Sequence, residues 1–124
     1  MEYFESEIIE DIAIESVKMV RITFIEAKLF WERLQTNVIP EYSKVIVDIS
    51  NCKFIDTTFM GVLIRTHRML LKEKGELKLV LAKDYIDKFL RVVGITEIIE
   101  TNISVKDAIN SFKYKDNVGN MVTS

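Results

Sequence analysis

The sequence contains few of the residues that enzymes and exported proteins use most. It has one cysteine, Cys52, one histidine, His67, and one proline, Pro40, among 124 residues. A single cysteine excludes an intrachain disulfide and favours a reducing compartment, so we expect a cytoplasmic protein. One cysteine and one histidine leave few ligands for a zinc site. No grouping of Ser, His and an acidic residue suggests a catalytic triad. We interpret Cys52 as a small buried hydrophobe and His67 as a residue at the edge of a core, and we expect neither a metal nor an enzyme.

Glycine and long apolar segments are also scarce. The four glycines, Gly61, Gly75, Gly94 and Gly119, cannot form a GxGxxG motif or a phosphate-binding loop. No apolar segment approaches the roughly 18 residues that a membrane-spanning helix needs. The acidic start of the chain differs from the basic start of a secretory signal. These absences predict a chain without a cofactor, without membrane insertion and without export.

The composition that remains is that of one globular domain. Hydrophobic residues make up 48% of the chain and charged residues 29%, and 17 basic residues against 19 acidic ones give a net charge of −2. Such a balance lacks the basic signature of proteins that bind phosphate backbones, so we expect no direct nucleic acid binding. No repeat or linker divides the sequence. We predict a single domain over residues 1–113 and a flexible, polar C-terminal tail over residues 114–124.

Apolar periodicity in the first half predicts two strands, a helix and a central strand. Alternation in residues 12–14, a polar break at residues 15–16 and a β-branched segment in residues 17–24 predict a hairpin. A helix is expected from Glu26, with Pro40 just beyond its end. The almost continuous apolar segment of residues 45–49 is typical of a strand covered on both faces. The buried stripe of the helix is predicted to be Ala27, Phe30, Leu34 and Val38.

The second half alternates helices and strands. A long helix follows Asp56 and is expected to end at Gly75 in a left-handed conformation. A buried strand over residues 77–81 precedes a helix that begins after Asp84 and stops at Gly94. Ile95, Ile98 and Ile99 suggest a short last strand, and a final helix over residues 105–112 follows Ser104. The order ββαβαβαβα predicts an α/β fold: a mixed sheet of four to five strands with about four helices.

The most informative segment is the junction at which the central strand leads into the long helix. Here Asp56 is followed by two hydroxyl residues, Thr57 and Thr58. The simplest interpretation is a capped helix N-terminus. A phosphate on a hydroxyl at this position would nevertheless be tolerated by the fold, because free backbone N–H groups and the helix dipole favour negative charge there. It would add roughly −1.5 to −2 charges beside Asp56, enough to expel a partner that fits the neutral side chain.

The segment from Val45 to Glu100 resembles the core of a STAS domain, the fold of bacterial anti-anti-sigma factors. Three features carry the resemblance, which spans about residues 10 to 112. They are an apolar strand that closes on Asp48, the Phe-x-Asp-Ser/Thr-Ser/Thr turn at Phe54–Thr58, and the step Val93-Gly94-Ile95. The chain departs from the family pattern in using Thr where Ser is common and in placing Phe59 where glycine is usual.

The resemblance implies a regulatory protein–protein interaction module. Thr57 would be the phosphoacceptor, and Asp56, Thr57, Thr58, Phe59 and Met60 would form the partner-binding face. The unmodified domain would bind an anti-sigma factor with serine/threonine kinase activity, and the phosphorylated domain would be released and later restored by a metal-dependent phosphatase. Phe59 would either restrict the approach of the kinase or serve as an apolar anchor for a partner, since aromatic residues are favoured in interface cores.

Two other functions are compatible with parts of the pattern. A STAS domain that is never phosphorylated would act as a scaffold or as an accessory subunit of a membrane transport complex. A two-component receiver would use Asp48 as its acceptor, but the opening hairpin and the lack of an acidic pair after a first βα unit argue against it.

Charge is unevenly distributed along the chain. Residues 1–15 hold six carboxylates and no basic residue, which would protect a sheet edge from self-pairing. Arg65, Arg68, Lys72 and Lys74 lie on the long helix. They make a soluble outer face in the simplest interpretation, and an acidic partner could also use them.

Overall fold

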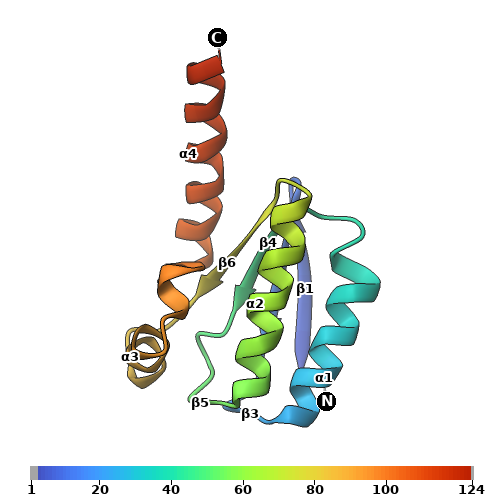
Figure 1. Cartoon of the computed structure of the whole chain (residues 1–124), viewed down its shortest axis with the longest axis vertical. Helices are drawn as coiled ribbons and strands as arrows, with labels where there is room; N and C mark the ends of the chain where they lie inside the picture. The colour runs from blue at the N-terminus through green and yellow to red at the C-terminus, as the bar shows by residue number, and fades with distance from the viewer. Residues whose placement is uncertain (1–2, 124) are drawn as a thin grey trace.

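The fold is built on one five-stranded mixed sheet with strand order β1-β2-β4-β6-β7. The computed structural model describes residues 3–123. Strand β1 is antiparallel to β2, and the other neighbouring pairs are parallel. The central strand is β4, the apolar segment expected to be buried on both faces (Figure 1). The strands are β1 (Phe4–Ile9), β2 (Ile12–Val17), β4 (Lys44–Asp48), β6 (Glu76–Val80) and β7 (Glu100–Asn102).

Four α-helices cover the two faces of the sheet. They are α1 (Phe24–Arg33), α2 (Thr57–Lys72), α3 (Tyr85–Val92) and α4 (Val105–Thr123). Together with the strands they confirm the predicted order ββαβαβαβα. Three short elements were not predicted: a two-stranded parallel sheet of β3 (Arg21–Ile22) and β5 (Phe54–Ile55), a π-helical turn, η1 (Leu34–Val38), and a 3₁₀ turn, η2 (Ile95–Glu97).

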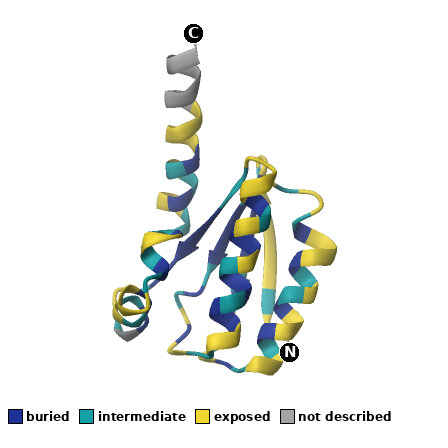
Figure 2. Cartoon of the chain, viewed as in Figure 1, coloured by how far each residue is buried: buried dark blue, intermediate teal, exposed yellow. Residues whose placement is uncertain are grey.

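The core has two parts, one on each face of the sheet, because successive strand residues point to opposite sides. Val45 and Val47 of β4 belong to the larger cluster, which packs under α1, α2 and α3. Ile46, between them, belongs to the smaller cluster under α4. Figure 2 shows buried residues in dark blue on β4 and β6 and at intervals along α2, where they alternate with exposed ones. The predicted α1 stripe is confirmed, with all four of its members buried: Ala27, Phe30, Leu34 and Val38.

The hairpin lies nearer the N-terminus than predicted. It joins β1 to β2, with Glu10 in a left-handed turn (φ 56°), whereas the prediction placed its two strands in residues 12–24. Strand β1 was not predicted, because it is the exposed edge of the sheet and its sequence shows no clear apolar alternation. Glu15, interpreted as part of a polar break, is buried inside β2, where its carboxylate accepts a hydrogen bond from Arg33 at 2.8 Å. The exposed Glu5 and Glu7 lie on the edge strand, as the acidic start suggested.

Two predicted boundaries in the second half are wrong. Ile95 begins the 3₁₀ turn η2 rather than a strand, and the last strand, β7, follows it as a short half-buried polar segment. Gly94 follows the end of α3 as predicted, and it takes a left-handed conformation (φ 86°). At the end of α2, however, the left-handed residue is Lys74 (φ 60°) and not Gly75.

Gly75 is required by close packing instead. A Cβ atom at this position would lie 2.0 Å from the carbonyl oxygen of Ser43, a contact with backbone that cannot be relieved by a side-chain rotation. We expect Gly75→Ala to lower the free energy of unfolding by about 2 kcal/mol, the middle of the range for overpacking. Urea denaturation checks this. Gly61→Ala is the matched control, because a Cβ there meets nothing within 4 Å, and should raise stability by about 0.5–1 kcal/mol. Equal effects of the two substitutions would contradict the packing argument.

Helix α4 continues to Thr123, beyond the predicted end at residue 112. Its second part shows no apolar period because ion pairs rather than an apolar stripe attach it to the body. Lys113 pairs with Glu10 at 3.1 Å, and Asp116 pairs with Lys44 at 2.5 Å. The prediction of a flexible tail from residue 114 therefore differs from the structure, in which α4 extends to Thr123. The division into a domain of residues 1–113 and a tail of residues 114–124 stays a prediction.

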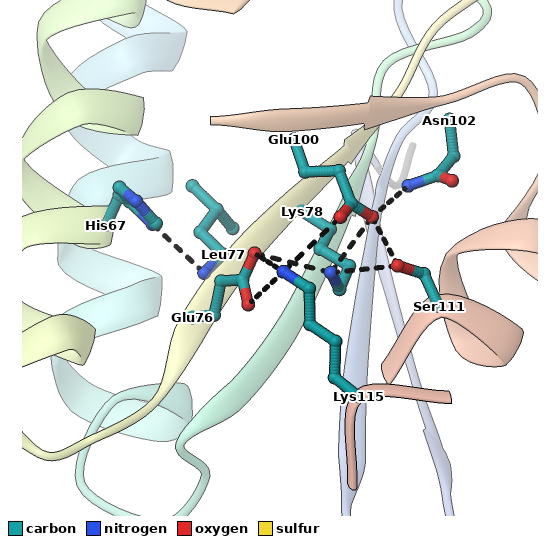
Figure 3. A network of polar contacts seen from close by, with 8 residues as sticks. All are labelled: His67, Glu76, Leu77, Lys78, Glu100, Asn102, Ser111 and Lys115. Carbon is teal, nitrogen blue, oxygen red and sulfur yellow. Dashed lines mark hydrogen bonds and ion pairs between the residues drawn. The ribbon is translucent and has the colours of Figure 1, made fainter. Parts of the chain in front are cut away.

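A polar cluster fastens α4 to the sheet at β6 and β7 (Figure 3). At its centre the fully buried Lys78 of β6 places its ammonium 2.9 Å from a carboxylate oxygen of Glu100 and 3.3 Å from Glu76. Ser111 of α4 donates a hydrogen bond to Glu100 and accepts one from Lys78. Lys115, one turn further along α4, bridges both carboxylates, so the cluster pairs two cations with two anions.

Candidate functional site

The candidate site lies at the edge of the sheet where the parallel strands end at their carboxyl termini. The chain leaves β4 after Asp48, passes through β5 and enters α2 (Figure 1). Asp56 is the N-cap of α2, with extended backbone (φ −72°, ψ 151°), and its carboxylate accepts the backbone N–H of Thr58 at 2.6 Å. This is the capped helix N-terminus expected from the sequence, with Asp56 as the capping residue and Thr57 next to it.

The two threonines differ in how their hydroxyls are used. The pKa of Asp56 lies below its ordinary value because Thr58 donates hydrogen bonds to it from both its side chain and its backbone N–H. Within residues 3–123 no hydrogen bond from the Thr57 hydroxyl is found, although the side chain is exposed at the first position of α2. Thr57 therefore presents the more accessible nucleophilic oxygen of the pair, beside the free N–H groups of a 16-residue helix.

Phe59 and Met60 do not belong to the surface. Phe59 is completely buried, with its ring centroid 5.5 Å from that of Phe30, and Met60 is only 8% exposed. Both expectations for Phe59, an obstacle to a kinase and an anchor for a partner, are corrected by this burial: its bulk fills the interior between α1 and α2. Of the five residues predicted to bind a partner, the structure leaves Asp56, Thr57 and Thr58 accessible.

A groove of about 280 Å³ opens beside this loop, on the side of the small β3–β5 sheet. The guanidinium of Arg21 lies over the exposed ring of Phe54, 4.7 Å from its centroid. The motif at Phe54–Thr58 includes Phe54, but no sequence pattern links it to Arg21, because β3 and β5 are two-residue strands that pair across more than 30 positions. The groove is lined by Arg21, Ile22, Thr23, Phe54, Ile55, Asp56, Ile86 and Phe89.

The cysteine and the histidine serve the fold. Cys52 is buried, and burial raises the pKa of its thiol to about 12, which removes the thiolate needed for nucleophilic chemistry. Nδ1 of His67 accepts the backbone N–H of Leu77 at 3.2 Å, which joins α2 to β6 (Figure 3). Burial lowers the pKa of His67, so the neutral imidazole that this acceptor role requires is favoured. No group of three His, Cys, Asp or Glu side chains that could hold a metal is found in the described part of the chain.

The comparisons with known proteins assign the family. A sequence model of the STAS domain matches residues 2–108, so the chain belongs to the STAS domain family. The predicted STAS fold, with a mixed sheet of four to five strands and about four helices, is thereby confirmed: the main sheet has five strands and the described chain has four α-helices. No curated protein sequence matches the chain.

Several solved structures share this fold. An anti-sigma factor antagonist from Mycobacterium paratuberculosis is 18% identical, with a TM-score of 0.78 over 87% of this chain and 91% of the other. The anti-sigma factor antagonist SpoIIAA in its unphosphorylated form is 14% identical, with a TM-score of 0.75 over 89% and 96%. The murine Solute Carrier 26 anion transporter member A9 is 15% identical, with a TM-score of 0.68 over 87% of this chain and 18% of the transporter. At these identities the likeness establishes the fold.

Among the described residues no helix combines the length and apolar character needed to span a bilayer.

Proposed function

We propose that this STAS domain is an anti-sigma factor antagonist that is switched by phosphorylation of Thr57. The observation that carries the proposal is the exposed Thr57 hydroxyl, which has no hydrogen bond in the described structure and lies at the N-terminus of α2 beside the capping carboxylate of Asp56. The unmodified loop binds an anti-sigma factor with serine/threonine kinase activity, and the sigma factor is thereby released. The domain is the substrate in this scheme and not an enzyme.

Phosphorylation would change the charge of the loop without breaking the fold. The γ-phosphoryl group of ATP moves to the Thr57 oxygen, ADP leaves, and the hydroxyl proton is lost. The product places roughly −1.5 to −2 charges next to Asp56, on the surface that had fitted a neutral hydroxyl. The helix N-terminus tolerates this charge because its free N–H groups and dipole are positive. The partner is released, and a metal-dependent phosphatase restores the hydroxyl.

Intact mass and phosphopeptide mapping of the protein from its own cells, before and after phosphatase treatment, test the proposal. We expect a fraction of molecules to carry one phosphate, located on Thr57, and this fraction to disappear in Thr57→Ala but to persist in the neighbouring Thr58→Ala control. Phosphate on Thr58 alone, or on neither residue in any growth condition, would contradict the assignment of Thr57.

The alternative is a STAS domain that binds constitutively, as a scaffold or as an accessory subunit of a membrane transport complex. It is favoured by the shared fold of the segment in the Solute Carrier 26 anion transporter. An unphosphorylated Thr57 together with stable co-purification of a membrane transport protein would select this alternative.

A further inference from the structure

The outer side of α2 carries a line of residues that lie outside the hydrophobic core. At 3.6 residues per turn, five positions fall within a sector of about 80° on the side opposite the buried Phe59, Leu63 and Leu70. We call this line the α2 stripe. It begins with the candidate phosphoacceptor and continues with one glycine and three cations: Thr57, Gly61, Arg65, Arg68 and Lys72.

Gly61 has no structural reason to be glycine. It lies inside the helix, its backbone φ is not positive, and an added Cβ would meet nothing within 4 Å. Glycine in a helix interior costs about 1 kcal/mol relative to alanine. The chain therefore gives up stability within this stripe, which is understandable if another backbone must approach α2 closely at Gly61.

The charge of the stripe has one sign. Helix α2 contains no acidic residue between its cap Asp56 and Glu73. No ion pair within the described part of the chain involves Arg65, Arg68 or Lys72. The guanidinium of Arg65 lies 4.8 Å from the ring centroid of the half-buried Trp31 on α1. Tryptophan and arginine are among the residue types most enriched in the energetic hot spots of protein interfaces.

We infer that the α2 stripe docks an acidic segment of the anti-sigma factor, with the backbone of that segment passing over Gly61. The inference rests on the proposed function and names the chemistry of the partner. Charge complementarity selects the occupant, because the stripe offers three cations that make no ion pair within residues 3–123, and no anion.

This arrangement also explains how one phosphate can act on the partner. On a helix, the Thr57 side chain is closest to positions three and four residues further along, and the fourth is Gly61, which has no side chain to pair with a phosphate. Arg65 lies about 12 Å further along the helix axis and is already placed over Trp31. The charge on phosphorylated Thr57 is therefore not neutralised along its own stripe, and it repels the acidic segment that the cations hold.

The first step of the test identifies the partner. A photo-crosslinking amino acid at Arg68 is expressed in the native cells, and the crosslinked protein and peptide are identified by mass spectrometry. The inference expects an acidic peptide of an anti-sigma factor. It is overturned if no protein crosslinks from Arg68, or if the same protein crosslinks equally well from Lys106 on α4.

The second step measures the affinity of the purified partner for matched variants. The double variant Arg68→Glu/Lys72→Glu should weaken binding about tenfold or more, mainly through slower association. The control Lys88→Glu/Lys106→Glu makes the same change in net charge and should change the affinity less than about twofold.

The variant Gly61→Leu tests the close approach of the partner's backbone. It should weaken binding about 100-fold without lowering the unfolding temperature, whereas Asn110→Leu, at an exposed position of α4, should leave the affinity unchanged. Wild-type affinity in the Gly61→Leu and Arg68→Glu/Lys72→Glu variants overturns the inference.

Two further measurements separate this inference from the proposed function. If phosphorylation of Thr57 abolishes binding but the stripe variants bind normally, the phosphorylation switch is supported and the docking role of the α2 stripe is overturned. If the stripe variants lose binding but phosphorylation of Thr57 has no effect, the docking role of the α2 stripe is supported and the phosphorylation switch is overturned. Stripe-dependent binding to phosphatidylglycerol vesicles, with unchanged affinity for the protein partner, overturns the inference in favour of a membrane surface.

Discussion

Replacing Thr57 with glutamate should reduce the affinity for the anti-sigma factor by about 100-fold and leave the stability of the domain within about 0.5 kcal/mol of the wild type. The loss follows from desolvating a new carboxylate next to that of Asp56 in the interface, a situation that costs several kcal/mol. The unchanged stability follows from the exposed position at the start of α2, where negative charge interacts favourably with the helix dipole. Calorimetric titration of the partner and urea denaturation measure the two quantities.

Thr57→Gln separates charge from size in this experiment. Glutamine has almost the same shape as glutamate but is neutral, so it should retain most of the affinity. A glutamine variant that binds as poorly as the glutamate variant would show that the loop rejects bulk rather than charge, and the phosphate would then act sterically. A large loss of stability in the glutamate variant would instead assign Thr57 to the helix cap alone.

Most of the fold was predictable because the buried segments carry strong periodic signals. The apolar segment around Ile46 is buried on both faces, and the three- to four-residue stripe from Ala27 to Val38 forms the inner side of α1 and η1. The elements that escaped prediction depend on contacts between distant residues. Strand β1 is held by its pairing with β2 and by contacts with α1, such as that between the rings of Phe4 and Phe30. The second part of α4 is attached by ion pairs such as that between Lys113 and Glu10.

The candidate site was predicted in its position and partly in its composition. The cap at Asp56 is local chemistry, so the sequence alone was sufficient to locate it. Phe59 was assigned to the surface because it follows the loop directly, yet it belongs to the helical period of Leu63, Thr66 and Leu70, all of which are buried. The helical spacing of these positions is a sequence signal that predicts burial of Phe59. No sequence signal brings Arg21 onto Phe54, because their strands are far apart along the chain.

Lys78 illustrates a different limit of prediction. A lysine in an apolar strand pattern is expected to be exposed, but this one is completely buried. Its charge is accepted in the interior because Glu76, Glu100 and Ser111 surround the ammonium (Figure 3). The ring centroid of Phe112 also lies 4.5 Å from the ammonium nitrogen. These partners come from β6, β7 and α4, so the burial of Lys78 depends on the assembled fold.

The largest effect on stability is expected for Glu100→Gln, which should lower the free energy of unfolding by about 3 kcal/mol at pH 7, as for other buried pairs that lose one partner. Burial alone would raise the pKa of Glu100, but hydrogen bonds from Ser111, Lys78 and Asn102 outweigh it and lower the pKa from 4.5 to about 2. A shift of this size corresponds to about 3 kcal/mol of stabilisation by the ionised form.

The pH dependence of this effect has a definite sign. Because the pKa of Glu100 is lower in the folded state, its contribution is present above pH 4.5 and is lost as the pH falls towards 2. The stability of Glu100→Gln and of the wild type should therefore converge between pH 4.5 and pH 2, as measured by urea denaturation across this range. Glu97→Gln, at an exposed position without an ion pair in the described chain, is the control and should follow the wild type throughout. A constant difference between Glu100→Gln and the wild type from pH 7 to pH 2 would mean that the shape of the side chain, and not its charge, holds α4 to the sheet.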